Sequence, residues 1–122
     1  MYYLNKNSSV PKYEQLSEKI KDLIIGKAIK WDEKMPSIRT LSKQIKISPN
    51  TVQKAYHHLE NQGYLYSIRG KGYYVAPIGM IQIKLKIENE FKPQFIRLLK
   101  IAKYLGLTKE EVIELLEKIE WD

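Results

Sequence analysis

The sequence predicts a mainly α-helical fold with one small β-hairpin, and three observations support this prediction. Apolar residues recur at steps of three and four in several short segments, which is the spacing of one helix face. A serine or threonine stands in front of three of the helical segments, and a glycine follows three of them, at Gly26, Gly63 and Gly106, as at helix ends. One glycine-punctuated stretch, residues 64–75, has β-prone residues on both sides of a turn. The 122 residues suffice for one modest core and a small appendage.

A first helix is predicted over residues 11–26. Pro11 suits the first helical turn, where its missing N–H does no harm, and Gly26 is a stop signal. Residues 1–10 are expected to form a flexible arm, and residues 27–36 a connector. One apolar stripe runs along this helix and consists of Tyr13, Leu16, Ile20, Leu23 and Ile24.

Two further helices follow with a tight turn between them. Ser37 can cap a short helix over residues 38–45. Ser48 and Pro49 are suited to the N-cap and first position of a third helix, which runs to about residue 61 or 62. Gly63 is well placed to end it in a left-handed conformation. The inner face of the third helix is expected to comprise Val52, Ala55, Tyr56 and Leu59.

A hairpin is predicted after the third helix. Residues 64–67 and 73–75 are β-prone, and the connection 68–72 contains two glycines. Pro77 breaks the second strand. Helix, turn, helix and hairpin in this order predict a winged helix–turn–helix domain over residues 1–77, with the hairpin as its wing.

Residues 78–122 are expected to be helical, although one part is ambiguous. A capping box at Thr108 and Glu111 opens a final helix over residues 109–120, and an apolar stripe from Phe91 to Ala102 predicts a helix before it. Residues 81–87 alternate between apolar and polar, which taken alone indicates a strand. Pro93 could start a helix, or it could kink a longer helix that begins near Met80.

The net charge of +7 is unevenly distributed along the chain. Residues 1–77 contain thirteen basic and six acidic residues, whereas residues 78–122 contain eight of each. All of the excess positive charge therefore belongs to the helix–turn–helix part. A solvated lysine-rich surface is one explanation, but a polyanion partner explains the asymmetry better, because basic surfaces release condensed counterions from phosphates.

The third helix has a polar face that suits the major groove of DNA. Asn50, Gln53, Lys54 and His57 recur at helical spacing, opposite the apolar stripe. Asparagine and glutamine can pair with adenine, lysine with guanine or phosphate, and the methyl group of Thr51 with thymine. A merely solvated face usually carries glutamate–lysine pairs, yet this face has no acid before residue 60.

Basic residues outside this helix are candidate backbone contacts. Arg39 can reach a phosphate while the next helix lies in the groove, unless it pairs with Asp32 or Glu33 instead. Arg69 and Lys71 lie at the hairpin tip between glycines, where a basic tip can enter a minor groove or clamp a phosphate. The same glycines could serve only a tight turn.

Five sequence blocks resemble the GntR family of bacterial transcription regulators, specifically short members of the YtrA-like subfamily. The five blocks, each numbered by its first residue, are Pro11-Lys-Tyr-Glu-Gln-Leu, Met35-Pro-Ser-Ile-Arg-Thr-Leu, Ser48-Pro-Asn-Thr-Val-Gln-Lys-Ala-Tyr, Leu59-Glu-Asn-Gln-Gly and Arg69-Gly-Lys-Gly-Tyr-Tyr-Val. The resemblance spans about residues 10–77. It implies a winged helix–turn–helix, a homodimer, and binding of double-stranded DNA at palindromic operators, most often as a repressor.

The resemblance also implies individual contacts. Many relatives have arginines where Pro49 and Gln53 stand here, so their base preference does not transfer. The blocks match family contacts at Arg39, at five positions in the third helix and at two in the wing. Together with the residues inferred above, the candidate DNA-binding set is Ser37, Arg39, Ser48, Pro49, Asn50, Thr51, Gln53, Lys54, His57, Arg69, Gly70 and Lys71.

For residues 78–122 the resemblance implies a two-helix dimerisation segment, with residues 80–87 as the start of a helix. About 45 residues are too few to enclose an effector pocket of several hundred Å³ within one chain. A small-molecule pocket at the dimer interface, lined by Phe91, Phe95 and Trp121, is the alternative. The expected dimerisation residues are Phe91, Phe95, Leu98, Leu99, Ala102, Val112, Leu115, Leu116 and Ile119.

Other function classes find little support. The chain has no cysteine, and His57 and His58 are adjacent on a helix and cannot face one metal, so no metal or cofactor is expected. No nucleophile–base set or phosphate loop indicates an enzyme. No signal peptide or membrane span is predicted, which favours the cytoplasm. A winged-helix adaptor that binds another protein is a further alternative to a DNA-binding regulator.

Overall fold

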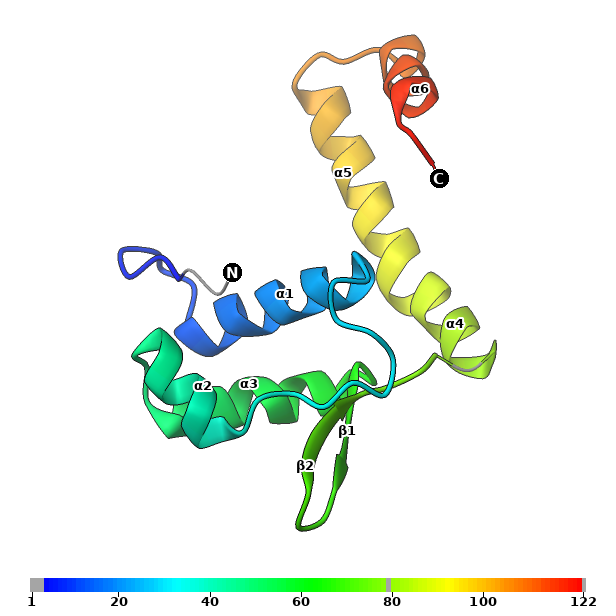
Figure 1. Ribbon diagram of the computed structural model, residues 1–122. Helices are drawn as coiled ribbons and strands as arrows, with labels where there is room; N and C mark the ends of the chain where they lie inside the picture. The colour runs from blue at the N-terminus through cyan, green and yellow to red at the C-terminus, as the bar shows by residue number, and fades with distance from the viewer. Residues whose placement is uncertain (1–3, 79, 122) are drawn as a thin grey trace. The chain divides into compact units, whose positions relative to one another are not determined.

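The computed structural model describes residues 4–78 and 80–121, and it has the predicted fold class. The chain divides into two compact units, Met1–Ile78 and Gly79–Asp122. The first unit contains three helices and a two-stranded antiparallel hairpin, and the second is helical (Figure 1). The prediction of a mainly α-helical protein with one small hairpin is therefore confirmed.

The helices of the first unit are α1 (Lys12–Ile25), α2 (Ile38–Ile45) and α3 (Pro49–Asn61). Their apolar stripes meet in a single core because α1 and α2 both pack against α3. Burial of apolar surface at these crossings provides the main favourable free energy of folding. The fully buried side chains of this core include Leu16, Ile20, Leu41, Val52, Ala55, Tyr56, Leu59, Leu65 and Val75.

The N-terminal ends of α2 and α3 are capped by the serines that the sequence predicts. The Oγ of Ser37 accepts a hydrogen bond from the Thr40 amide at 3.0 Å. The Oγ of Ser48 does the same for the Thr51 amide at 3.2 Å. Each serine thus satisfies an amide that has no partner within its helix, as predicted. Lys46 ends α2 with a left-handed φ of 57°, and this makes the turn into α3 tight.

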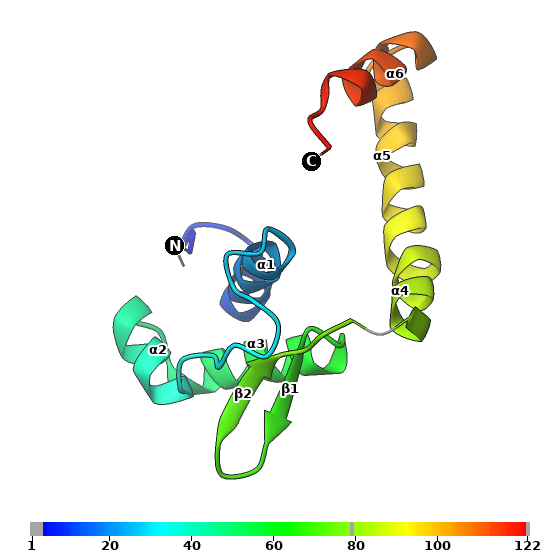
Figure 2. The same ribbon diagram turned by 45° about the vertical axis from the view of Figure 1, so that its right-hand side comes forward.

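The wing consists of β1 (Leu65–Ile68) and β2 (Gly72–Val75), which project away from the helices (Figure 2). The strand β1 is shifted by one residue from the predicted 64–67, and β2 starts one residue before the predicted 73–75, so the tip is only residues 69–71 rather than 68–72. The predicted tip was too long because Ile68 pairs with Gly72 and extends the ladder by one step. Gly63, with φ 83°, makes the left-handed turn that leads from α3 towards the wing.

The connector between α1 and α2 contributes an unpredicted edge to this sheet. Lys34 forms an isolated antiparallel bridge with Tyr74. The Met35 amide donates to the Tyr73 carbonyl at 2.8 Å, and the Val75 amide donates to the Glu33 carbonyl at 3.0 Å. The connector therefore runs along the free side of β2, and residues 33–35 are held in place by the wing.

The described part of the N-terminal arm, residues 4–10, forms hydrogen bonds with α1 that the sequence pattern did not predict. The Asn5 amide donates to Oε1 of Gln15 at 2.8 Å. The Nε2 of Gln15 donates to the carbonyls of Asn5 at 3.1 Å and Val10 at 2.8 Å. Leu4 also packs against the core. One glutamine side chain thus anchors residues 4–10, and the sequence pattern alone does not reveal this.

The second unit begins with α4 (Met80–Lys86), a π-helical segment η1 (Ile87–Phe91) and α5 (Lys92–Tyr104), which follow one another without a break. The ambiguity at residues 81–87 is therefore resolved in favour of helix. The π-helical segment ends at Phe91, two residues before Pro93. A proline ring clashes with the carbonyl four residues earlier, and a widened turn relieves this clash.

The last helix, α6 (Lys109–Lys118), starts where the capping box predicts. The Oγ1 of Thr108 accepts from the Glu111 amide, and the Glu111 carboxylate accepts from the Thr108 amide, both at 3.1 Å. The helix ends at Lys118 rather than residue 120, because Ile119 is extended, with ψ 127°. Gly106, with φ 90°, makes the turn between α5 and α6.

Candidate nucleic-acid interface

The start of α3 presents a polar surface to solvent. Asn50 and Gln53 are exposed, and the opposite face of the helix is buried in the core. Within the described chain, neither amide side chain forms a hydrogen bond, so their donors and acceptors are free for a partner. Such amides can each make two hydrogen bonds to the edge of an adenine. The fold therefore displays the two side chains that the sequence singled out for base contact.

The hydroxyl groups near the helix starts are already engaged. Ser48 Oγ and Thr51 Oγ1 are 2.8 Å apart, and Ser37 Oγ donates to Thr40 Oγ1 at the same distance. These contacts rigidify the two helix N-termini. Pro49, Ser37 and Ser48 remain exposed, whereas Thr51 is half-buried. Free backbone amides at helix N-termini favour anions such as phosphate, so the starts of α2 and α3 are candidate phosphate contacts.

Arg39 is exposed on α2 and is free to bind an anion. The competing explanation for this arginine was an ion pair with Asp32 or Glu33. In the described chain it forms neither pair, and both acids have other partners. Asp32 Oδ1 accepts from the Tyr66 hydroxyl at 2.8 Å, and Glu33 Oε1 accepts from the Lys30 amide at 3.2 Å. The same hydroxyl bond raises the pKa of Tyr66 above its usual value.

The side chain of Lys54 extends from the polar face of α3 towards α1. Its Nζ is 4.1 Å from the ring centroid of Tyr13 on α1, a cation–π contact. A helical wheel could not reveal this contact because it depends on how α1 crosses α3. We therefore place Lys54 at the edge of the candidate surface, on the α1 side.

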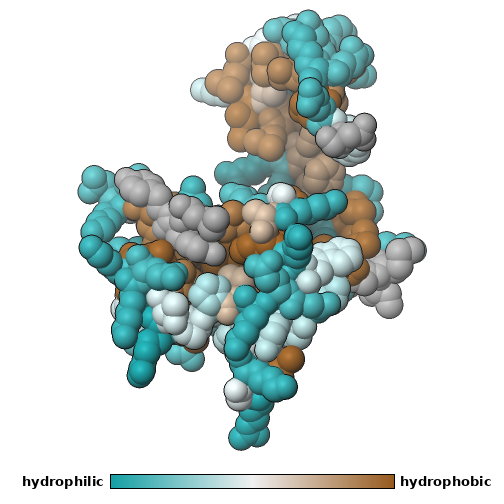
Figure 3. Space-filling view, in the orientation of Figure 1, coloured by the Kyte–Doolittle hydropathy of each residue, from teal (hydrophilic) through white to brown (hydrophobic). Residues whose placement is uncertain are grey.

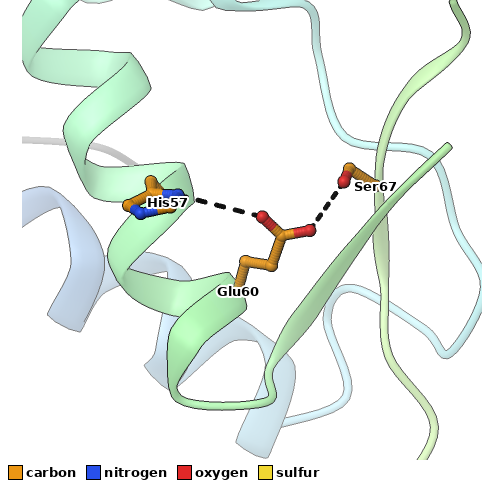
Figure 4. A network of polar contacts seen from close by, with 3 residues as sticks. All are labelled: His57, Glu60 and Ser67. Atoms are coloured by element: carbon orange, nitrogen blue, oxygen red, sulfur yellow. Dashed lines mark hydrogen bonds and ion pairs between the residues drawn. The ribbon is translucent and has the colours of Figure 1, made fainter. Parts of the chain in front are cut away.

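Glu60 connects the end of α3 to the wing (Figure 4). One carboxylate oxygen accepts from the Ser67 hydroxyl of β1 at 2.6 Å, and the other lies 3.9 Å from Nδ1 of His57. His57, expected to contact DNA, thus has an acidic neighbour one turn along its helix. Glu60 thus holds β1 against α3, and the sequence pattern did not predict this role. Glu60 and Ser67 are seven residues apart across a turn, and no local sequence pattern indicates such a pair.

The tip of the wing is basic and exposed. Arg69, Gly70 and Lys71 lie beyond the paired strands, and the Lys71 amide donates to the Ile68 carbonyl at 2.9 Å to close the turn. Gly70, with φ 79°, occupies the left-handed region and has open space around it. The glycines therefore serve a tight turn and also leave both cations accessible, so the two interpretations of this tip are compatible.

Comparison with known proteins decides the family. The profile described as "Bacterial regulatory proteins, gntR family" matches residues 12–75, from the start of α1 to the end of β2. The chain belongs to the GntR family. The family assignment makes this protein a DNA-binding regulator of transcription, in agreement with the sequence prediction.

Similarity to other GntR proteins extends beyond the winged helix–turn–helix. The chain is 34% identical to the HTH-type transcriptional repressor YtrA of Bacillus subtilis (strain 168) over 122 residues, which is all of this chain and 94% of YtrA. The structure resembles a transcriptional antiterminator from Listeria monocytogenes EGD-e with a TM-score of 0.80 and 32% identity, covering 97% and 88% of the two chains. These relatives are named as regulators, not as enzymes.

One similar structure contains DNA. AraR(DBD) in complex with operator ORX1 matches with a TM-score of 0.55 and 37% identity, over 61% of this GntR chain and 92% of AraR(DBD). The matching part of AraR(DBD) is therefore a winged helix–turn–helix seen on its operator.

The second unit of this GntR protein exposes its apolar residues. None of the side chains described in residues 82–121 is buried, and hydrophobic residues gather over α5 and α6 (Figure 3). Leu98 is 62% and Leu115 55% exposed. Of the expected dimerisation residues, Phe95, Ala102 and Val112 are half-buried, and the others are exposed. Ile119 lies just outside α6.

An apolar groove of about 630 Å³ lies between α5 and α6. Phe95, Leu99, Val112 and Leu116 are among its lining residues. Phe91 stacks on Phe95 with ring centroids 5.6 Å apart but does not line the groove, and neither does Trp121. The three aromatic residues suggested for an effector pocket are therefore not brought together by this unit alone.

Within residues 4–78 and 80–121, no group of three or more histidine, aspartate or glutamate side chains is arranged to hold a metal ion. No helix there is long and apolar enough to cross a membrane.

Proposed function

We propose that this protein is a homodimeric transcriptional repressor that binds a palindromic operator, with α3 in the major groove and the wing against the adjacent backbone or minor groove. The observation that carries this proposal is the exposed start of α3. Asn50 and Gln53 are free there, on a helix whose other face is fixed in the core. Arg39 on one side and the wing tip on the other are suited to phosphates, which would orient the helix.

The charge distribution supports a nucleic-acid partner for the first unit. This unit contains the whole excess of positive charge, and several of its cations, such as Arg39, form no ion pair with other described residues. The adaptor alternative explains neither the charge nor the free amides. A regulator of this kind would act in the cytoplasm, where bacterial DNA lies.

Dimerisation is supported by the lack of a core in the second unit. A helix pair that buries none of its described side chains cannot be stable in water by itself, because helices depend on packing of their apolar faces. A second copy of the same helices would cover these faces. Two first units held in this way could place their recognition helices about 34–36 Å apart, one turn of DNA.

Repression is proposed from similarity to the YtrA repressor of B. subtilis, which aligns over the full length of this chain. A dimer that occupies an operator would exclude the transcription machinery from that DNA.

The proposal is tested by titrating DNA duplexes with the protein at several salt concentrations. We expect affinity to fall steeply with salt, because each phosphate contact releases counterions. An adaptor that binds only protein would show no salt-dependent affinity for DNA. Sedimentation of the free protein should give the mass of a dimer, and a monomer at micromolar concentration would contradict the proposed assembly.

A ligand-responsive switch is a second candidate, and the apolar groove between α5 and α6 favours it. The groove has the volume of a small-molecule site. A thermal-shift screen of candidate metabolites would separate this possibility from a regulator without an effector, because a bound ligand raises the melting temperature.

A further inference from the structure

The backbone of Lys34 is fixed beside the wing. Its neighbours Glu33 and Met35 exchange backbone hydrogen bonds with β2, and Lys34 itself is opposite Tyr74. Residues opposite each other in an antiparallel pair project from the same face of the sheet. Lys34 and Tyr74 therefore share the outer face, away from the core side on which Tyr73 packs against Tyr56.

The side chain of Lys34 extends along that face towards the tip. Gly72 is two residues from Tyr74 and so lies on the same face. The Cε of Lys34 is 3.7 Å from the point that a Cβ on Gly72 would occupy. That distance is an ordinary van der Waals contact, so the lysine stem passes directly over Gly72. The stem directs the ammonium group towards the tip that contains Arg69 and Lys71.

The ammonium group of Lys34 is free to bind an anion. Lys34 is exposed, and it forms no ion pair with any acid in the described chain. Its nearest acidic neighbours in sequence have other partners: Asp32 accepts from the Tyr66 hydroxyl, and Glu33 accepts from the Lys30 amide. Residues 69–75 contain no acid. The hairpin tip and its edge strand therefore present three basic residues, Lys34, Arg69 and Lys71, and none of them forms an ion pair with a described carboxylate.

We propose that Lys34 contacts a DNA phosphate beside the wing, as a third basic residue acting with Arg69 and Lys71. The inference rests on the proposed function, because it assumes that the wing lies against DNA. A lysine ammonium is a compact point charge on a flexible stem, which suits a phosphate rather than a base edge. Lys34 should therefore add affinity to every sequence alike and add no base preference.

The experiment compares Lys34→Met with the wild type on two fluorescent duplexes of equal length. One duplex is recovered by selection from random DNA, and the other is a scrambled version of it. Methionine keeps an unbranched stem over Gly72 and removes the charge. We expect binding to both duplexes to weaken about two- to fivefold, as for loss of one exposed charge pair. The slope of log affinity against log salt should fall by about one.

Two further variants separate charge from packing. Lys34→Arg keeps the positive charge and should restore the salt slope. Lys19→Met is the control, because Lys19 is an exposed lysine of α1 that lies beside the acids Glu18 and Asp22. This substitution should leave the salt slope unchanged. Thermal melting checks that each variant is folded.

Three outcomes would overturn the proposal. If the wild type binds DNA and Lys34→Met binds with the same affinity and salt slope, the lysine contact is excluded. The proposed function is not affected by that outcome. A loss that Lys34→Arg does not restore, accompanied by a lower melting temperature, assigns Lys34 a structural role instead. A wild-type protein that binds neither duplex overturns both this inference and the proposed function.

Discussion

Tyr56→Phe tests how the helix–turn–helix is held together. Tyr56 is fully buried on α3, and its hydroxyl donates to the Pro36 carbonyl at 2.8 Å. Its ring meets Tyr73 edge-on, with centroids 5.1 Å apart. Pro36 directly precedes the cap of α2, so this hydrogen bond fixes the start of α2 against α3. The substitution removes one oxygen atom and leaves the packing of the ring unchanged.

The size of the effect follows from the loss of that bond. A hydrogen bond contributes about 0.5–1.5 kcal/mol, and a buried carbonyl left without its donor costs about 1–3 kcal/mol. Because Pro36 is only half-buried, water can partly replace the donor. We therefore expect a loss of about 1–2 kcal/mol in the free energy of unfolding. Each kcal/mol corresponds to about 4–8 °C in Tm for a domain of this size.

Thermal or urea unfolding at one fixed protein concentration measures this loss, since a dimer's Tm depends on concentration. Tyr74→Phe is the matched control. Tyr74 stacks on Tyr66 at 5.5 Å, and its hydroxyl forms no hydrogen bond with other described residues. The control should lose less than about 0.5 kcal/mol. Equal losses in the two variants, or a Tyr56→Phe protein that melts like the wild type, would refute the reasoning.

Other substitutions probe the surfaces in turn. Arg39→Ala should weaken binding to all duplexes and lower the salt slope by about one, and an unchanged slope would count against a phosphate contact. Leu98→Glu or Leu115→Glu should give monomers in sedimentation, because a charge cannot be buried unpaired in the apolar interface; persistent dimers would exclude that interface. Ser67→Ala removes the bond to Glu60, so amides of β1 should exchange faster with deuterium, and unaltered exchange would show that this bond does not hold the wing.

Features set by local sequence were predictable. Ser37, Ser48 and Thr108 act as helix caps where expected, because a cap needs only residues within one turn. The apolar stripe of α3 likewise predicted which face would be buried, and hence that Asn50 and Gln53 would be exposed. Residues 81–87 were ambiguous because alternation over a short span does not distinguish an exposed helix from a strand.

Features that depend on packing between distant segments were missed. Lys34 pairs with Tyr74 across forty residues of sequence, and the connector has no alternation that would reveal an edge strand. The position of Lys54 over Tyr13 depends on how two helices cross. Gln15 holds the arm through hydrogen bonds that no periodic pattern marks. The sequence therefore indicated which residues belong to the candidate site, but not the directions in which their side chains extend.

Selection of binding sites from random DNA, with the wild type and with Gln53→Ala, tests the central claim most directly. The wild type should enrich an inverted repeat whose half-sites are about one helical turn apart. Gln53→Ala should enrich the same repeat with one position in each half-site relaxed, because a free amide on α3 then no longer reads its base. Enrichment of no common sequence by the wild type, or an identical preference in both proteins, would contradict reading of the operator by the exposed start of α3.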